Sequence, residues 1–242
     1  MSRRPGGAIL AALAAGCCCA AAPAAAQATT TASTHASFAP NRLGASTALT
    51  LSFGFSGSGE EGVPAPLSGM VLHLPAGLTV NLRGIGTCAK SRLQSKGAAG
   101  CPSGSLVGHG HALMKVHAGS LAVPEEATVT IFRGPNRGGD PTLEIFGQGE
   151  TPLDESTIST GVLAADKLTV SIPPIPTLVY EPNASFVSLS LTVGGAGHGP
   201  RAHAADVIVV PHSCPSGGFP FAASFMFADG STAGASAKVA CP

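Results

Sequence analysis

The sequence predicts an all-β protein, an antiparallel β-sandwich or jelly roll of about a dozen short strands stapled by disulfides. Hydrophobic residues alternate with small or polar ones over many short runs, and 32 glycines and 20 prolines interrupt these runs. Alternation with period two is typical of strands. A proline inside a helix costs about 3 kcal/mol, so long helices are excluded. Without intervening helical periods, the runs favour two packed antiparallel sheets.

The N-terminal segment has the pattern of an export signal. Two arginines provide a positively charged start, residues 8–22 form an apolar run too short to span a bilayer, and small residues follow. Overlapping Ala-x-Ala patterns predict cleavage by signal peptidase and a mature chain that starts at Gln27 or Thr29. We therefore expect residues 1–28 to be a signal peptide and the protein to be exported.

An alternative interpretation of this segment is a lipoprotein signal, with Cys17 acylated. The residues Leu-Ala-Ala-Gly-Cys at 13–17 resemble a lipobox, and the segment that follows Cys17 would be a flexible tether. A lipobox normally has Leu three residues before the cysteine, where this chain has Ala14. One acyl chain would also anchor the protein only weakly. The expected location is secreted or associated with the cell envelope, with lipidation at Cys17 left open.

The domain prediction follows from the alternating runs. Residues 29–37 are expected to be a flexible segment and residues 38–242 a single β-sandwich domain, although two small sandwiches joined near 149–152 remain an alternative. The first strand is predicted at 49–55, where Leu and Phe alternate with small or polar residues. Further strands are predicted at residues 70–74, 79–83, 129–131, 143–146, 157–163, 167–172, 187–193 and 207–210.

The C-terminal part predicts a β-hairpin. Phenylalanines and small residues alternate over 221–227, Asp229-Gly230 is a type I′ turn signal, and 231–239 returns. This hairpin would bring Cys241 back to within a few residues of Cys214.

Four cysteines lie outside the signal segment: Cys88, Cys101, Cys214 and Cys241. In a chain bound for an oxidising compartment the default is two disulfides. Three connectivities are open, and we favour the two couples that are near in sequence, the second of which the hairpin supports. Each bond would contribute on the order of 3 kcal/mol in the chain-entropy model. Zinc is the competing interpretation, but the chain has no Cys-x-x-Cys pair.

His109 and His111 are the candidate metal ligands. On a strand, residues two apart share one face, so these imidazoles could bind one copper or zinc ion together. His117 shares the face but would lie about 20 Å further along. A third ligand would have to come from elsewhere in the chain: His73, His198, His203 or His212. The alternative is a solvated polar face that holds no cofactor. Leu113 lies on the histidine face, which suggests a bulge near Gly110.

Composition argues against several function classes. The formal net charge is zero and the basic residues are scattered, so a nucleic-acid partner is not expected. No apolar run after the signal is long enough for a transmembrane segment. The chain has neither a Gly-x-Ser-x-Gly elbow nor a His-Glu-x-x-His motif, so no catalytic residue is predicted. Its paired carboxylates, at 60–61, 125–126 and 154–155, are each expected at solvated turns.

Lys90, Arg92 and Lys96 give the segment between Cys88 and Cys101 a basic character. The ordinary explanation is a solvated surface loop. The functional alternative is a contact with an anionic polymer of the cell envelope.

Several turn and cysteine elements occur in a distinctive order. They are Leu-Pro-Ala-Gly-Leu at 74–78, Cys88, Cys-Pro-Ser-Gly-Ser-Leu-Val-Gly at 101–108, and Val-Pro-His-Ser-Cys at 210–214. This order resembles exported β-rich proteins of high-GC actinobacterial type, with LPxGL, Cys, CPxxSxVG and PxxC elements. The resemblance implies a disulfide-bearing envelope or secreted β domain, and it implies no activity.

The functional expectation is a secreted or cell-envelope structural or interaction module that is not an enzyme and whose extracellular partner is unknown. The alternative is an extracellular metal-binding protein or hydrolase whose histidines or carboxylates are brought together by the fold.

Overall fold

The computed structural model describes residues 30–57, 62–119, 121–194 and 207–242, and most of these residues lie in strands. The strands are β1 (Thr31–Ala39), β2 (Ser46–Ser56), β3 (Leu67–His73), β4 (Thr79–Val80), β5 (Leu106–Ala118), β6 (Leu121–Arg137), β7 (Asp140–Thr151), β8 (Ser156–Ala164), β9 (Lys167–Ser171), β10 (Ser185–Gly194), β11 (Ile208–Val209), β12 (Phe219–Phe227) and β13 (Thr232–Val239). The helical elements are α1 (Lys90–Lys96) and two 3-10 turns, Ala98–Gly100 and Ser103–Ser105. The proposed signal peptide and Cys17 lie outside the described residues.

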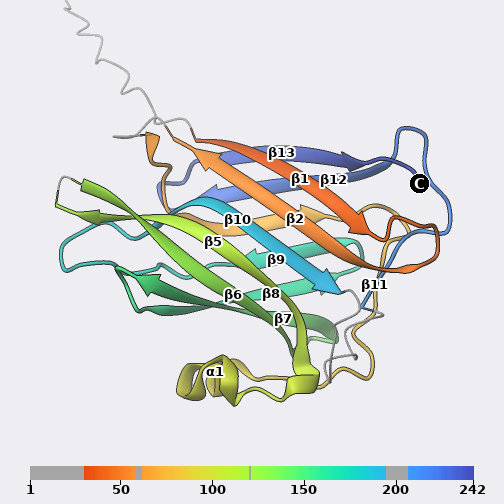
Figure 1. Cartoon of the computed structure of the whole chain (residues 1–242), viewed down its shortest axis with the longest axis horizontal. Helices are drawn as coiled ribbons and strands as arrows, with labels where there is room; N and C mark the ends of the chain where they lie inside the picture. Colours follow the sequence, from red (N-terminus) through yellow and green to blue (C-terminus); the bar gives the residue numbers. More distant parts are fainter. Residues whose placement is uncertain (1–29, 58–61, 120, 195–206) are drawn as a thin grey trace, which may run out of the picture.

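One antiparallel sheet contains all of the described strands, in the order β13-β12-β3-β9-β8-β7-β6-β5-β10-β2-β11-β4, with β1 also paired to β2. The sheet curls into a half-barrel, so its two ends face each other (Figure 1). The predicted all-β antiparallel class with two disulfides is confirmed. The two facing layers belong to one continuous hydrogen-bonded sheet.

The layers are held together at one end by phenylalanines. Phe38 of β1 packs against Phe219 and Phe221 of β12, with ring centroids 5.7 and 6.0 Å apart. Phe55 of β2 packs edge-on against Phe225 at 4.8 Å. Such pairs contribute about 0.5–1.5 kcal/mol each beyond the area they bury. The alternating phenylalanines of the C-terminal hairpin therefore form the packed part of the core.

The N-terminal segment differs from the prediction. Residues 29–37 were expected to be flexible, but Thr31–Ala39 forms β1, which pairs with β2 over its whole length. The segment lacks the large alternating side chains that indicate a strand. Its inward positions are instead filled by small residues such as Ala36, which is 4% exposed.

A second, smaller core lies on the outer face of β6, β7 and β8. The segment between Cys88 and Cys101 was predicted to be a loop, but it contains α1, which buries Leu93. The residues of this core are Cys88, Leu93, Phe132, Phe146 and Ile158. A single buried side chain in a short helix leaves no periodic signal, so sequence patterning could not have found it.

Within the described ranges, no helix is both long and apolar enough to cross a membrane.

Candidate functional site

An apolar cavity lies between the layers of the half-barrel, beside the contact between Phe55 and Phe225, which both line it. Its volume is about 70 Å³, and its walls come from nine strands: β2, β3, β5, β6, β7, β8, β9, β10 and β12. This volume equals roughly two or three methylene-sized groups, since a water molecule's share of liquid volume is about 30 Å³. The cavity therefore suits a short, slender group.

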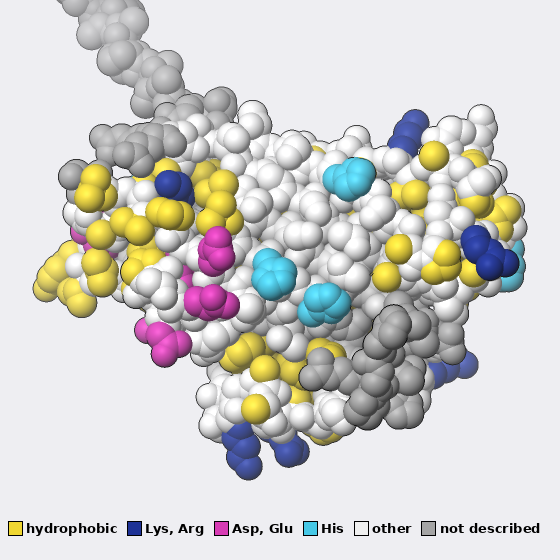
Figure 2. Space-filling view, in the orientation of Figure 1, with side chains coloured by type: hydrophobic (Ala, Val, Ile, Leu, Met, Phe, Trp, Pro, Cys, Tyr) yellow, Lys and Arg dark blue, Asp and Glu magenta, His cyan; other side chains and the backbone are white. Residues whose placement is uncertain are grey.

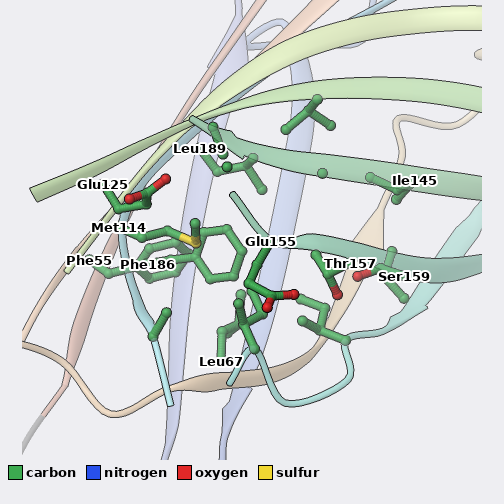
Figure 3. A pocket seen from close by; sticks show the side chains of 18 of the residues that line it. Phe55, Leu67, Met114, Glu125, Ile145, Glu155, Thr157, Ser159, Phe186 and Leu189 are labelled. Carbon is green, nitrogen blue, oxygen red and sulfur yellow. The ribbon is translucent and has the colours of Figure 1, made fainter. Parts of the chain in front are cut away.

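Small inward-facing residues on β7 and β8 leave this space open. Gly147 and Gly149 follow Ile145 on the inner face of β7, and on β8 Ser159 pairs with Ile145 and Thr157 with Gly147. A packed core would place larger apolar residues at such positions. The remaining wall is apolar and includes Met114, as Figure 3 shows.

Glu125 lies at one side of the cavity and is only 1% exposed. Its two carboxylate oxygens accept hydrogen bonds from the backbone N–H groups of Glu150 and Leu153, each at 2.9 Å. These bonds hold the β7–β8 connection against β6. The residue was expected at a solvated turn, but it lies within a strand and points inward. A buried carboxylate that accepts backbone N–H bonds satisfies donors that would otherwise be unpaired.

Glu155 marks the mouth of the cavity, because this residue lines the cavity and is also exposed at the surface. In the view of Figure 3 the carboxylates of Glu125 and Glu155 lie on either side of Met114 and Phe186. These two glutamates are the charged residues of the cavity wall, which has no lysine, arginine or histidine among its described residues. The site is therefore an apolar cavity, and the formal charges among its described lining residues are both negative.

The connection between β9 and β10 closes the other side of the mouth. Ile175 and Ala184 line the cavity and are buried, and the N–H of Ala184 donates to the carbonyl of Ile175 at 2.9 Å. The connection thus has a fixed base at the cavity and a turn that projects outward.

The predicted histidines lie elsewhere. His109 and His111 are both exposed on the outer face of β5, next to each other on one side of the strand as expected. Their cross-strand neighbours are hydroxyl residues, Thr130 and Thr128 on β6. Figure 2 shows histidines scattered on a surface otherwise poor in charge. The bulge predicted near Gly110 is wrong, because the pairing with β6 shifts between Leu106 and Gly108.

Among the described residues, no third ligand joins the pair. In the part of the chain that the structure describes, no three His, Cys, Asp or Glu residues are grouped to hold a metal ion. Of the candidates for a third ligand, His198 and His203 lie outside the described residues. His73 and His212 are described and do not complete a group.

The other predicted carboxylates divide into two cases. Glu60 and Glu61 lie outside the described residues. Asp154 and Glu155 lie in the β7–β8 connection, where Asp154 accepts a 2.8 Å hydrogen bond from the Gln148 side chain. Patterning missed Glu144, which is 2% exposed and accepts a hydrogen bond from the Thr160 hydroxyl at 2.8 Å.

The basic candidates lie on α1. Arg92 and Lys96 are exposed and Lys90 is half-buried. The Arg92 guanidinium donates through Nε to the carbonyl of Gly100, which helps to fix the end of the segment. Figure 2 shows lysine or arginine side chains at the lower edge of the molecule, where Figure 1 places α1, apart from a group of acidic side chains.

Both disulfides are present in the favoured pairing. Cys88 is bonded to Cys101 and Cys214 to Cys241, with Cα separations of 5.4 and 5.9 Å. The first encloses α1 and the second ties the end of β13 to the start of the C-terminal hairpin.

Comparison with protein-family models, curated proteins and solved structures finds no match to this chain. The functional argument therefore depends on the geometry of the site.

Proposed function

We propose that the protein is an exported, non-catalytic binding module that holds a slender apolar group, such as an alkyl or acyl chain, in the half-barrel cavity. The observation that carries this proposal is an apolar cavity that reaches the surface at Glu155. A concave apolar site with a few polar groups at its edge is the usual form of a ligand pocket. Export agrees with the two disulfides, which persist in oxidising compartments.

The charge of the wall predicts the head group of the ligand. Glu125 and Glu155 repel an anionic head group at the mouth and attract a cationic one. Thr157 offers a hydroxyl at the same side of the cavity. The expected ligand is therefore a chain with a neutral or cationic polar end.

Calorimetric titration with three probes that share one short chain length tests both parts of the proposal: butylamine, butan-1-ol and butanoate. We expect butylamine and butanol to bind and butanoate to bind at least several-fold more weakly. The preference for the amine should shrink in Glu155→Gln, because this variant removes the exposed charge of the mouth. Failure of all three probes would contradict chain binding, and strongest binding of butanoate would contradict the assignment of the head group.

The basic residues of α1 support a second proposal, a contact with an anionic envelope polymer. None of the described carboxylates lies within ion-pair distance of Lys90, Arg92 or Lys96, so these charges are available to a partner. Such a contact should weaken with salt. Reversing Lys90 and Lys96 to Glu should abolish binding to purified cell-wall polymer, whereas Lys238→Glu, on the C-terminal hairpin, should leave it unchanged.

A further inference from the structure

Four large apolar side chains are exposed together at the end of the molecule where the cavity opens. Leu121, at the start of β6, is 63% exposed. Leu178, Val179 and Tyr180, in the β9–β10 connection, are 50%, 80% and 102% exposed. We call these four residues the apolar tip. Figure 2 shows yellow side chains gathered at this end, with acidic side chains along their border.

The backbone at Tyr180 has an unusual conformation. The N–H of Glu181 donates to the carbonyl of Leu178 at 3.1 Å, so residues 178–181 form a β-turn. Tyr180 is the third residue of this turn and has φ +69°. That position favours glycine, because the side chain of any other residue is strained there. Tyr180 has a strained backbone and an exposed side chain, so a contribution to folding stability does not explain why tyrosine occupies this position. Backbone strain of this kind is typical of functional positions.

Hydrogen bonds hold the tip in place. The Thr177 hydroxyl donates to the carbonyl of Pro182 at 2.6 Å across the base of the turn. The carboxylate of Glu181 accepts a 2.9 Å hydrogen bond from the N–H of Gly119, which joins the turn to the β5–β6 connection and so to Leu121. The exposed side chains are therefore presented on an anchored support, which lowers the entropy that binding would cost.

The tip has the shape and composition of a contact with a lipid surface. Two neighbouring turns make it convex, and a fluid lipid surface accepts a convex tip without a matching groove. Its area is roughly a few hundred Å², well below the ~800 Å² per partner of a stable protein interface. Tyrosine, with an apolar ring and a polar hydroxyl, is enriched where lipid meets water.

The charges around the tip determine which lipid surface fits. Lys115 is the neighbouring cation, and its ammonium donates to the carbonyl of Ala122 at 3.1 Å. Carboxylates outnumber it in the neighbouring segments of β6, the β7–β8 connection and the β9–β10 connection: Glu126, Glu150, Asp154, Glu155 and Glu181. Their negative charge repels an anionic lipid surface, so the surface that the tip fits is neutral or zwitterionic.

We propose that the apolar tip docks the protein on a neutral or zwitterionic lipid surface and places the mouth of the cavity against it. The tip and the cavity share one connection, because Ile175 and Ala184 line the cavity and Leu178 to Tyr180 project from the same loop. An apolar chain could then pass between lipid and cavity without crossing water. Docking itself follows from the tip alone. Only the passage of a ligand depends on the proposed function.

Flotation with vesicles tests the docking. The full mature chain should float with phosphatidylcholine vesicles and float less with vesicles that also contain phosphatidylglycerol. Tyr180→Gly should weaken partition roughly tenfold or more, since one large side chain no longer enters the lipid. The same variant relieves the positive φ, so its melting temperature should be unchanged or higher. A loss of binding with intact folding would separate a functional role from a structural one.

Leu43→Ser is the matched control, because Leu43 is 45% exposed and lies in the β1–β2 connection at the opposite end of the half-barrel. This variant should float like the wild type. Equal losses in Leu43→Ser and Tyr180→Gly, or no flotation of the wild type, would overturn the docking. Self-association in sedimentation velocity that Tyr180→Gly abolishes would also overturn it, in favour of a second copy of the chain. Flotation without butylamine binding would leave docking intact and reject the proposed function.

Discussion

Glu125 is the residue whose environment departs furthest from what sequence patterning suggests. Next to Glu126 it resembles part of a solvated acidic turn, yet it is buried and Glu126 is exposed on the opposite face of β6. The difference follows from the register of β6 against β7, which a local pattern does not contain. Tyr180 is a second residue whose environment could not be predicted, because no sequence pattern indicates its positive φ or its exposure.

Replacing Glu125 by Gln should destabilise the protein. In the native protein each carboxylate oxygen of Glu125 accepts a hydrogen bond from a backbone N–H. In the variant an amide NH₂ group replaces one of these oxygens, so one buried backbone N–H loses its acceptor. We expect a loss of about 1–3 kcal/mol in the free energy of unfolding, measured in urea. Glu126→Gln is the neighbouring control and should change stability by less than about 0.5 kcal/mol. Equal effects in the two variants would refute the structural role of Glu125.

Asp229 should titrate below the ordinary range for an aspartate. The side chain and then the backbone N–H of Ser231 donate to its carboxylate, and these bonds lower the pKa of Asp229. A lowered pKa in the folded state means that the carboxylate stabilises the hairpin turn above about pH 4 and that this contribution is lost as pH falls further. A carboxyl NMR titration measures it, and Ser231→Ala should raise the pKa toward the ordinary value. A pKa that does not move in this variant would contradict the assigned cause.

At the scale of elements, strands with large alternating side chains were predictable and the others were not. The runs in β2, β9 and β12 are visible because Leu, Val or Phe fill every inward position or most of them. β1 was missed because alanine and serine carry little signal, and α1 because it buries only Leu93. The two strands of the C-terminal hairpin were predictable, since Asp229-Gly230 marks its turn. The predicted type I′ turn is wrong, because Gly230 has a positive φ and Asp229 does not.

The disulfide of the C-terminal hairpin should matter more for stability than for the cavity. β13 is the last strand of the sheet, and the bond between Cys214 and Cys241 ties its end to the start of the hairpin. Replacing both cysteines by Ser should lower the free energy of unfolding by about 3 kcal/mol, measured by chemical denaturation without reductant. Butylamine binding at low temperature should persist, because neither cysteine lines the cavity. Loss of binding in a folded double variant would show that the hairpin shapes the site.

At the scale of the whole molecule, the cavity arises from the way distant strands are brought together. Its wall combines β2 near the start of the described chain with β12 near the end, and its space depends on Gly147, Gly149 and Ser159 facing inward together. Each of these residues is unremarkable in its own strand, so the site could not be located from sequence. The predicted histidines belong instead to a solvated outer face, where their neighbours are hydroxyl residues.

The central claim is that the half-barrel holds an apolar chain, and filling the cavity tests it most directly. Ser159 faces the cavity from β8 and is 7% exposed. Leu at this position would occupy the space that a chain needs, and it should preserve or raise the melting temperature because it fills an apolar void. The control is Ser190→Leu on the exposed face of β10. Calorimetric titration with butylamine should show binding to the wild type and to Ser190→Leu and at least tenfold weaker binding to Ser159→Leu. Equal affinity in folded Ser159→Leu and wild type would contradict the account.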